Sequence, residues 1–507
     1  MTAVRSACPP GSVALDLEAL HALLASSFDV SAGRPHLVRR TTLDTFDRRI
    51  ARAGRRLELI AEAGNERLEL AQGAQILANV LTGAGPQWPA MATALPDGTL
   101  KDHVARLAGI RALLVIGENQ RLVRRTELRN ADCKIVVRVD VEESADDGAT
   151  PPATVTVRPL RGYQKEADRV WRLVTTLLDP ATEPVAPPAE RPGPSAVDSG
   201  TPARALLAAE LTRFLDELRD NLPGTIADID TEFLHDVRVA VRRTRSLLKL
   251  GRPALPARFR EVWEPRFKWL GDLTTPVRDL DVYQLGLPEM AGWLVAAAAA
   301  DLGPFEAHLA RRRAAERRTL LRALRGARLR RLLDDWAVEL AELAGSVQSA
   351  EGAAWSAGGL ARANVARAHR RVVRGGAAIS DASPPEDLHL LRKRCKELRY
   401  AMEMFAPVLG YAQSRDAIRD LKKLQDVLGR FQDSEVQSTT LRGLAHEMVA
   451  DRAPAEALLA MGELTGHLHA EQQRARAEFA GVFASYVRPA GRRRVTRLIG
   501  DDGKAAG

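Results

Sequence analysis

The chain has 507 residues, more than one ordinary hydrophobic core holds, so the length predicts two or three domains. Apolar residues make up 45% and charged residues 27%, which excludes a largely disordered chain. Lysine and arginine number 74 against 65 acidic residues, and the net charge of +9 favours a polyanionic partner without showing where the charge lies.

The cysteines and the apolar runs bear on the compartment. Cys8, Cys133 and Cys395 are scattered and have no metal-like spacing, so we expect free thiols in a reducing environment. No apolar run approaches the ~18 residues that span a bilayer. We also find no charged segment followed by an apolar one, as a signal peptide would have. These features predict a cytoplasmic protein without membrane contact.

Residues 1–179 mix helical and strand patterns. Helices are predicted at 17–28 and 163–178. Strands are predicted at residues 37–42, 55–60, 134–141 and 154–158, and the last two alternate most clearly. This combination predicts an α+β domain with an antiparallel sheet. Proline-rich residues 180–203 contain few large apolar side chains and predict an extended linker.

After the linker the pattern is helical throughout, and nothing alternates as a strand does. Helices are predicted at residues 204–220, 232–250, 257–271, 277–300, 304–345, 356–377, 384–409, 412–449 and 453–487. Glycine and proline mark the breaks between them, for example at Pro223-Gly224. Residues 204–487 should therefore form an all-α domain, and residues 488–507 a basic, flexible tail.

One segment of this domain places its cations on a single helical face. His235, Arg238, Arg242, Arg245 and Lys249 fall within an arc of roughly 80° beside an apolar stripe. The same spacing returns in a second segment, which begins at His389. Its members are His389, Arg392, Lys396 and Arg399.

The two segments belong to a longer duplication. His235 precedes Asp279 by 44 positions, and His389 precedes Asp433 by 44 positions. A spacing kept over this length indicates two copies of one helical unit, at about 204–345 and 356–487, packed about a pseudo-twofold axis.

The cationic faces allow two interpretations. The plain one is a solvated charged face, but such faces usually mix acids with bases, because like charges one turn apart repel. The other is an anion site, and arginine suits phosphate because its planar fork can hold two oxygens. Residues 311–331 add ten arginines and a single acid, Glu316. This supply favours a long polyanion.

The roles of the histidines and aspartates stay open at this point. His235 and His389 could pack or cap a helix, or could donate to phosphate or orient an arginine. Asp279, Asp281 and Asp433 are expected to hold the arginines from behind, and a metal role is the less favoured alternative. We find no paired acid and nucleophile, so no catalytic residue, cofactor or metal is predicted.

The sequence H-D-V-R-V-A-V-R-R-T-R-S from His235, with its second copy L-H-L-L-R-K-R-C-K-E-L-R-Y, resembles the CHAD family of conserved-histidine α-helical domains. The resemblance implies two pseudo-symmetric helical bundles around a basic groove. It also implies non-enzymatic binding of inorganic polyphosphate and association with polyphosphate granules. The implied phosphate contacts are His235, Arg238, Arg242, Arg245, Lys249, Lys268, His389, Arg392, Lys393, Lys396, Arg399, Tyr400 and Lys423. Glu403 stands where the second copy should repeat Lys249.

The first half has a partial resemblance of its own. L-D-T-F-D at 43–47 and A-R-A-G-R-R-L-E-L at 51–59 are similar to the CYTH family of triphosphate tunnel enzymes. That family needs an E-x-E-x-K strand and a late strand with glutamates. The candidate for the first strand, 16–20, lacks the lysine. The candidate for the late strand, 154–158, has no carboxylate. We therefore expect a degenerate CYTH-like domain. Arginines that could still bind an anion are Arg39, Arg40, Arg124, Arg125 and Arg138.

Two other functions remain as alternatives. A metal-dependent triphosphatase or polyphosphatase in the first half would need clustered carboxylates, whose apparent absence argues against it. Sequence-specific nucleic-acid binding is disfavoured because aromatic residues are only 5% of the chain and do not interleave with the basic helices.

Overall fold

The computed structural model describes residues 5–7, 16–73, 75–83, 86–144, 153–177, 197–345 and 355–500. The chain divides into two compact units, residues 1–193 and 194–507. Most of the predicted linker at 180–203, and Cys8, lie outside the described residues.

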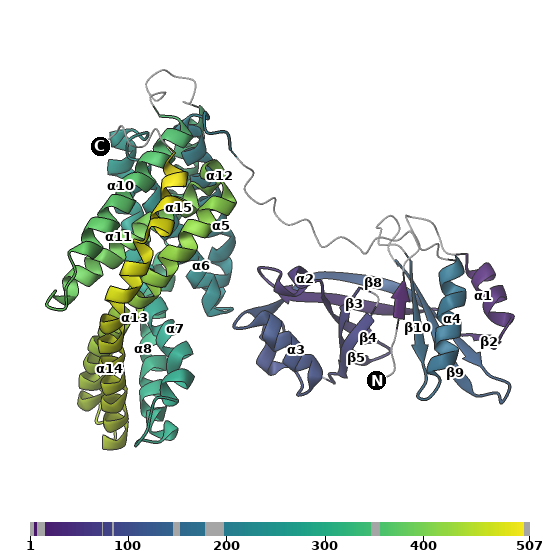
Figure 1. Ribbon diagram of the computed structural model, residues 1–507. Coiled ribbons are helices and arrows are strands. Elements are labelled where there is room, and N and C mark those ends of the chain that lie inside the picture. The colour runs from purple at the N-terminus through teal and green to yellow at the C-terminus, as the bar shows by residue number, and fades with distance from the viewer. Residues whose placement is uncertain are drawn as a thin grey trace. The chain divides into compact units, whose positions relative to one another are not determined.

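The N-terminal unit is an antiparallel sheet with helices packed against it (Figure 1). Its strands are β1 (Arg5–Ala7), β2 (Asp29–Ala32), β3 (His36–Thr45), β4 (Arg56–Glu62), β5 (Asn65–Gln72), β6 (Gln75–Leu81), β7 (Ala90–Met91), β8 (Ala112–Arg129), β9 (Ile135–Ser144) and β10 (Thr154–Pro159). Its helices are α1 (Leu17–Ala25), α2 (Arg49–Arg52), η1 (Ala92–Ala94), α3 (Thr99–Ala108) and α4 (Gln164–Leu177). The predicted α+β class with an antiparallel sheet is confirmed.

The sheet closes on itself. Its strand order runs β8-β3-β4-β5-β6-β1-β10-β9, and β9 pairs back onto β8 through residues from Arg121 to Arg129. Helices α1 and α4 cover β9 and β10 with a core that includes Leu24, Val139 and Val170. The strands β5, β6 and β8 were not predicted, although Arg67-Leu68-Glu69-Leu70 of β5 alternates between polar and apolar residues.

The C-terminal unit is helical, as predicted. Its elements are α5 (Ala203–Ala227), α6 (Thr231–Leu250), α7 (Ala257–Ala291), η2 (Ala299–Leu302), α8 (Gly303–Leu324), α9 (Ala327–Gly345), α10 (Ala357–Ala377), α11 (Pro385–Met404), α12 (Ala406–Leu409), α13 (Tyr411–Ala450), α14 (Ala455–Tyr486) and α15 (Pro489–Ile499). The break expected at Pro223-Gly224 is wrong, because α5 continues to Ala227. Gly224 is needed instead for close packing, since a Cβ there would lie 2.3 Å from the Phe233 ring.

The duplication extends further than the sequence motifs. Helices α5, α6 and α7 correspond to α10, α11 and α13, each starting 154 positions earlier (203 against 357, 231 against 385, 257 against 411). Pro202 and Ser356, which are also 154 positions apart, pair in an antiparallel bridge between the two copies. The two repeats therefore meet where each begins.

The prediction of a flexible tail at 488–507 is wrong for residues 489–499, and residues 501–507 lie outside the described residues. Residues 489–499 form α15, which packs on α10 and α13 as α9 packs on α5 in the first repeat. Val495 and Leu498 are buried in the second-repeat core. Arginines at 492–494 and 497 flank this apolar pair and obscured it in the sequence.

The helices α7, α8, α13 and α14 extend together beyond the rest of the bundle (Figure 1). A separate core joins them, with Leu287 and Phe305 on one side and Leu444 and Leu464 on the other. This core brings the end of α7 beside α13 and α14. Among the described helices, none combines the length and hydropathy required to cross a membrane.

Candidate functional site

The two motif helices, α6 and α11, line one cavity of about 970 Å³. Arg242, Arg245 and Lys249 enter it from α6, and Lys396 and Tyr400 enter it from α11. The guanidinium carbon of Arg242 lies 5.7 Å from the Tyr400 ring centroid, so the two copies are in contact here. The remaining charged side chains of this central cavity are Arg252, Glu264, Lys268, Arg367, Arg371, Lys393 and Glu397.

A smaller cavity of about 340 Å³ lies between α6 and α7 in the first repeat. His235, Arg238, Arg242 and Arg245 line it on one side, and Asp272 and Arg278 are among the residues on the other. We call it the first-repeat cavity. It collects four of the predicted contacts on one wall.

Arg238 is held in this cavity by neutral groups. It donates to the hydroxyls of Thr274 at 3.1 Å and Thr275 at 2.8 Å, and to the carbonyl of Gly271 at 3.3 Å. Burial lowers its pKa, and the positive charges of Arg278 and Arg242 lower it further, although Asp279 acts in the opposite direction. The charge of Arg238 is therefore only weakly compensated.

His235 lies beside the same cations. Burial lowers its pKa, and Arg278 adds to this effect. The imidazole is therefore mainly neutral at pH 7, where it can donate one hydrogen bond but adds little positive charge. This geometry agrees with the interpretation of His235 as a hydrogen-bond donor.

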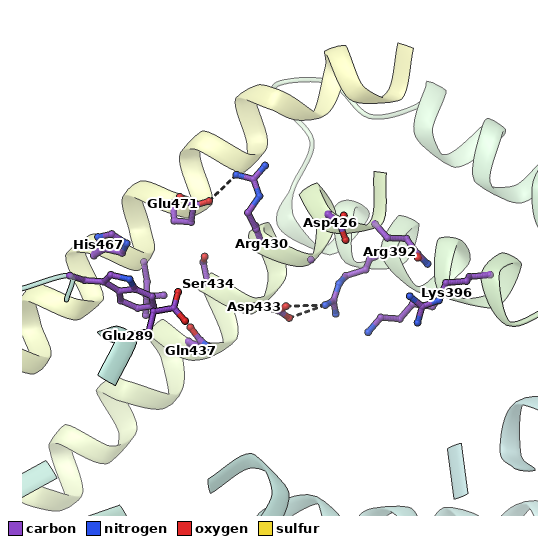
Figure 2. A pocket seen from close by; sticks show the side chains of 15 residues that line it. Glu289, Arg392, Lys396, Asp426, Arg430, Asp433, Ser434, Gln437, His467 and Glu471 are labelled. Carbon is purple, nitrogen blue, oxygen red and sulfur yellow. Dashed lines mark hydrogen bonds and ion pairs between the residues drawn. The ribbon is translucent and has the colours of Figure 1, made fainter. Parts of the chain in front are cut away.

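The second-repeat cavity, of about 660 Å³, lies between α11, α13 and α14 and reaches the end of α7 (Figure 2). Arg392, Lys396 and Arg399 line it, in the positions that Arg238, Arg242 and Arg245 take in the first repeat. Arg392 donates to the Asp433 carboxylate at 2.9 and 3.2 Å. Burial and the neighbouring Arg392 lower the pKa of Lys396 to about 8.

Neighbouring cavities share lining side chains, so the three lie in a row, which we call the path. Arg242 and Arg245 line both the first-repeat and the central cavity. Lys396 lines both the central and the second-repeat cavity. The path therefore crosses from one repeat to the other past a succession of cationic side chains.

Three of the predicted contacts either lie outside these cavities or pair with an acid. His389 contacts the Glu435 carboxylate at 2.7 Å and the Phe431 ring, and it does not line the second-repeat cavity. Lys423 is exposed and lines none of the three cavities. Lys268 lines the central cavity but pairs with Asp272 at 2.6 Å.

The supporting acids behave differently from one another. Asp433 pairs with Arg392 at 2.9 Å and itself lines the second-repeat cavity. Asp279 lies near Arg238, but burial raises its pKa and the described contacts include no hydrogen bond between the two. Asp281 is a correction, because it is fully buried and accepts from Arg313 of α8 at 2.5 Å instead of from an arginine of α6.

The arginines of 311–331, which were expected to add to the anion site, have another role. They line none of the three cavities, and some of them make structural ion pairs. Arg313 and Arg317 both bind Asp228 at 2.8 Å, and Arg312 pairs with Glu447. The sequence could not show this, because Asp228 directly follows α5 and Glu447 stands on α13, both far away along the chain.

The sequence also missed contributors to the central cavity. Arg367 and Arg371 come from α10, four positions apart on one face, which was a readable signal. Glu397 also lines the central cavity, and nothing in the sequence indicated an acid there. It pairs with Lys249 of the first repeat and with Arg371 at 2.8 Å.

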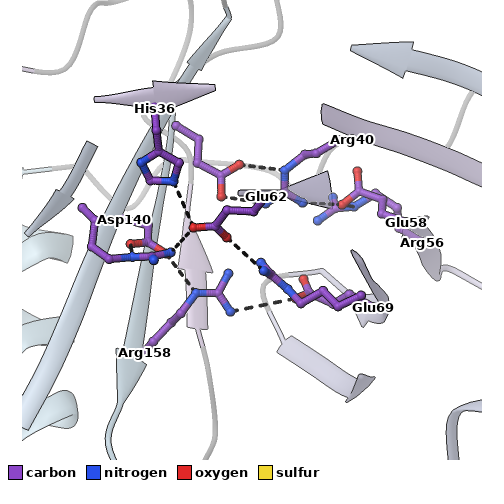
Figure 3. A network of polar contacts seen from close by, with 11 residues as sticks. His36, Arg40, Arg56, Glu58, Glu62, Glu69, Asp140 and Arg158 are labelled. Carbon is purple, nitrogen blue, oxygen red and sulfur yellow. Dashed lines mark hydrogen bonds and ion pairs between the residues drawn. The ribbon is translucent and has the colours of Figure 1, made fainter. Parts of the chain in front are cut away.

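The interior of the N-terminal sheet carries its own charged network (Figure 3). Arg40 donates to Glu58 at 2.7 Å and to both oxygens of Glu142 at 2.6 and 2.7 Å. Arg125 and Arg158 both donate to Asp140, at 2.7 and 3.1 Å. The interior of this domain therefore holds acidic side chains that the sequence pattern did not indicate. They stand on β4, β5 and β9, and β1 (R-S-A) has no acid.

These carboxylates do not fit a divalent metal ion. Each is engaged by arginine, and although burial acts in the opposite direction, Arg125, Arg67 and His36 lower the pKa of Glu62 to about 2. Within the described ranges, no group of three or more His, Cys, Asp or Glu side chains could hold a metal ion. Of the other predicted arginines, Arg39, Arg124 and Arg138 contact Glu66, Glu143 and Glu127 at 3.8, 3.7 and 3.2 Å.

Residues 209–442, which include both motif helices, match the family described as the CHAD domain. The helical unit carries a CHAD domain. The resemblance stated from the two sequence motifs is thus confirmed, and the central cavity lies between the two halves of the domain.

Solved structures resemble parts of the chain. The CHAD domain from the plant Ricinus communis is 25% identical, with a TM-score of 0.47, and the match covers 59% of this chain and 96% of that one. PptA from Streptomyces chartreusis is 20% identical, with a TM-score of 0.43, over 56% of this chain and 100% of that one. A candidate adenylate cyclase from Bacillus halodurans is 13% identical, with a TM-score of 0.24, over 38% of this chain and 97% of that one. No curated protein matches significantly.

Proposed function

We propose that the CHAD domain binds inorganic polyphosphate, without catalysis, along the path formed by the three cavities. The observation that carries the proposal is the sharing of Arg242, Arg245 and Lys396 between neighbouring cavities. A linear chain of phosphates can follow such a path, whereas a small anion fills only one part of it.

The chemistry of the path supports phosphate over other polyanions. Arginine forks and lysine ammonium groups both bind phosphate oxygens strongly. Nucleic acids bound as single strands also need aromatic faces for their bases. Among the residues that line the first-repeat and central cavities, Tyr400 is the one Phe, Tyr or Trp, and its ring already lies against Arg242. Trp293 lines the second-repeat cavity, where it stacks on His467.

Isothermal titration of the full chain with long-chain polyphosphate, at two salt concentrations, tests the proposal. We expect binding at low salt that weakens steeply as salt rises, by analogy with the counterion release that governs nucleic-acid binding. Absence of binding at low salt would end the proposal.

A charge-reversal pair gives this experiment its control. The variant Arg238→Glu, Arg242→Glu, Arg392→Glu, Lys396→Glu should lose binding and keep its helical circular dichroism. The matched variant reverses four exposed arginines that line none of the cavities and should keep most of the affinity. These are Arg318, Arg322, Arg325 and Arg330.

Polyphosphate binding in the cytoplasm would bring the protein to polyphosphate granules. A fluorescently tagged chain should then form foci in cells that hold polyphosphate. The same chain should be diffuse in cells that lack polyphosphate, and foci that persist there would contradict granule association.

The alternative is a metal-dependent triphosphatase in the N-terminal unit. The closed sheet has the charged interior that such a function needs, but its arginines and carboxylates already bind each other. We therefore expect no phosphate release from tripolyphosphate with Mg²⁺ or Mn²⁺. Release above a chain-free control would favour the alternative.

A further inference from the structure

The second-repeat cavity differs from the other two in its chemistry. Arg392 and Lys396 lie at one end of it, and Glu289, Gln437 and His467 lie at the other (Figure 2). Arg430 lies between the two ends, where it pairs with Glu471 at 2.9 Å. The carboxylate of Glu289, at the end away from Arg392 and Lys396, disfavours a uniformly charged polyanion there. A ligand that fills this cavity should therefore be anionic at one end only.

The end opposite the cations holds an aromatic stack. The rings of Trp293 and His467 have centroids 4.6 Å apart and planes inclined by 7°, and both rings line the cavity. Trp293 follows the end of α7 and His467 stands on α14, so helices of both repeats build the stack. Parallel stacked rings offer a flat apolar surface, which suits a planar heterocycle.

Polar groups surround this flat surface. Gln437 and Ser434 of α13 and Glu289 of α7 line the same part of the cavity. An amide, a hydroxyl and a carboxylate can accept from sugar hydroxyls and from the ring amino or N–H groups of a base. The volume of about 660 Å³ lies within the range of small-molecule sites.

We propose that this cavity binds a purine nucleoside polyphosphate. The base extends the Trp293–His467 stack, the sugar lies along α13, and the phosphates lie against Lys396 and Arg399. The proposal shares these two cations with the proposed polyphosphate path, and its nucleoside-binding end is separate from that path.

Isothermal titration of the full chain with ATP and with inorganic tripolyphosphate, in buffer containing EDTA, tests the proposal. Both ligands carry three phosphates, and tripolyphosphate lacks the nucleoside. We expect ATP to bind about tenfold more tightly, because stacking of one base on an aromatic side chain contributes this much or more. Equal or weaker binding of ATP overturns the proposal.

Substitutions at the stack identify the part of the cavity that is used. Trp293→Ala and His467→Ala should each weaken ATP binding by about tenfold and leave tripolyphosphate binding unchanged, while Trp293→Phe should retain most of the ATP affinity. Lys396→Ala should weaken both ligands. If neither alanine variant at the stack affects ATP, the proposal is wrong.

Long-chain polyphosphate separates this proposal from the proposed function. The Trp293→Ala and His467→Ala variants should bind it as the unchanged chain does, which also shows that they are folded. Polyphosphate binding without ATP binding overturns the nucleotide site alone. ATP binding without polyphosphate binding overturns the proposed function alone.

Discussion

The two repeats place the same cations at the same spacing and compensate them differently. Arg238 donates to threonine hydroxyls and a carbonyl, whereas its counterpart Arg392 donates to the Asp433 carboxylate. The cause lies on the facing helix, where Thr275 of the first repeat corresponds to Gly429 of the second. Without a hydroxyl at that position, Arg392 reaches the acid.

The histidines and the ends of the motif helices show the same difference, with acidic partners in the second repeat. His235 lies among arginines, whereas His389 contacts Glu435 at 2.7 Å. Arg399 contacts Glu403 at 3.3 Å, at the position where the first repeat has Lys249. A duplicated cationic motif therefore does not duplicate an anion site, because the partners on neighbouring helices decide how much charge stays available.

The largest expected effect is a loss of polyphosphate affinity, and it should differ between double substitutions in the two repeats. Within the described residues, Arg242 and Arg245 form no ion pair, so Arg242→Ala with Arg245→Ala removes two available charges. Hydrogen bonds to charged groups contribute about 1.5 kcal/mol each at the low end, so polyphosphate affinity should fall roughly 100-fold.

The matched variant is Arg392→Ala with Arg399→Ala, which removes the same net charge. Both arginines must first leave a carboxylate, so we expect a loss of only about tenfold. Titration of both variants with polyphosphate measures the difference. Equal losses would show that the ion pairs in the second repeat do not limit phosphate binding.

The sequence predicted the parts of the molecule that depend on local pattern. The basic faces at 235–249 and 389–399 follow from helical spacing, and the duplication follows from equal distances along the chain. Tertiary partners were not predictable in this way. Asp281 turned out to bind Arg313 of α8, and Glu397 turned out to reach Lys249 of the other repeat.

The N-terminal unit shows the same limit. Its carboxylates were overlooked because Glu58, Asp140 and Glu142 stand on strands other than those that the CYTH-like pattern points to. Only closure of the sheet brings them to Arg40 and Arg125. Neither closure nor this pairing leaves a periodic signal in the sequence.

The next largest effect is a pH dependence at Lys396, whose pKa is lowered to about 8. The ammonium is charged below this pKa and neutral above it, and a bound phosphate favours the charged form. Polyphosphate affinity should therefore fall by up to about tenfold between pH 7 and pH 9. Titrations across this range, at constant ionic strength, measure the effect.

Arginine at this position supplies the control. Lys396→Arg stays charged throughout the range, so its affinity should change little between pH 7 and pH 9. His235 does not confound the comparison, because its pKa is lowered from an ordinary value that already lies below this range. An equal pH dependence in both proteins would show that another group titrates.

The smallest expected effect is a gain of affinity. Glu397 of the second repeat pairs with Lys249 and Arg371, which both line the central cavity. Glu397→Gln should free both cations for phosphate. Partly exposed ion pairs contribute about 0.2–1 kcal/mol each, so we expect polyphosphate to bind roughly three- to fivefold more tightly and with a steeper salt dependence.

Glu456→Gln, at an exposed position in the first turn of α14, changes the net charge by the same amount outside the three cavities. This variant separates the effect of removing an acid from the central cavity from the effect of changing the net charge of the chain. If both variants bind polyphosphate equally well, the gain comes from net charge alone. If only Glu397→Gln binds more tightly, then an acid of the second repeat restrains the cations of the first, and the unequal compensation of the two repeats sets the affinity of the shared path.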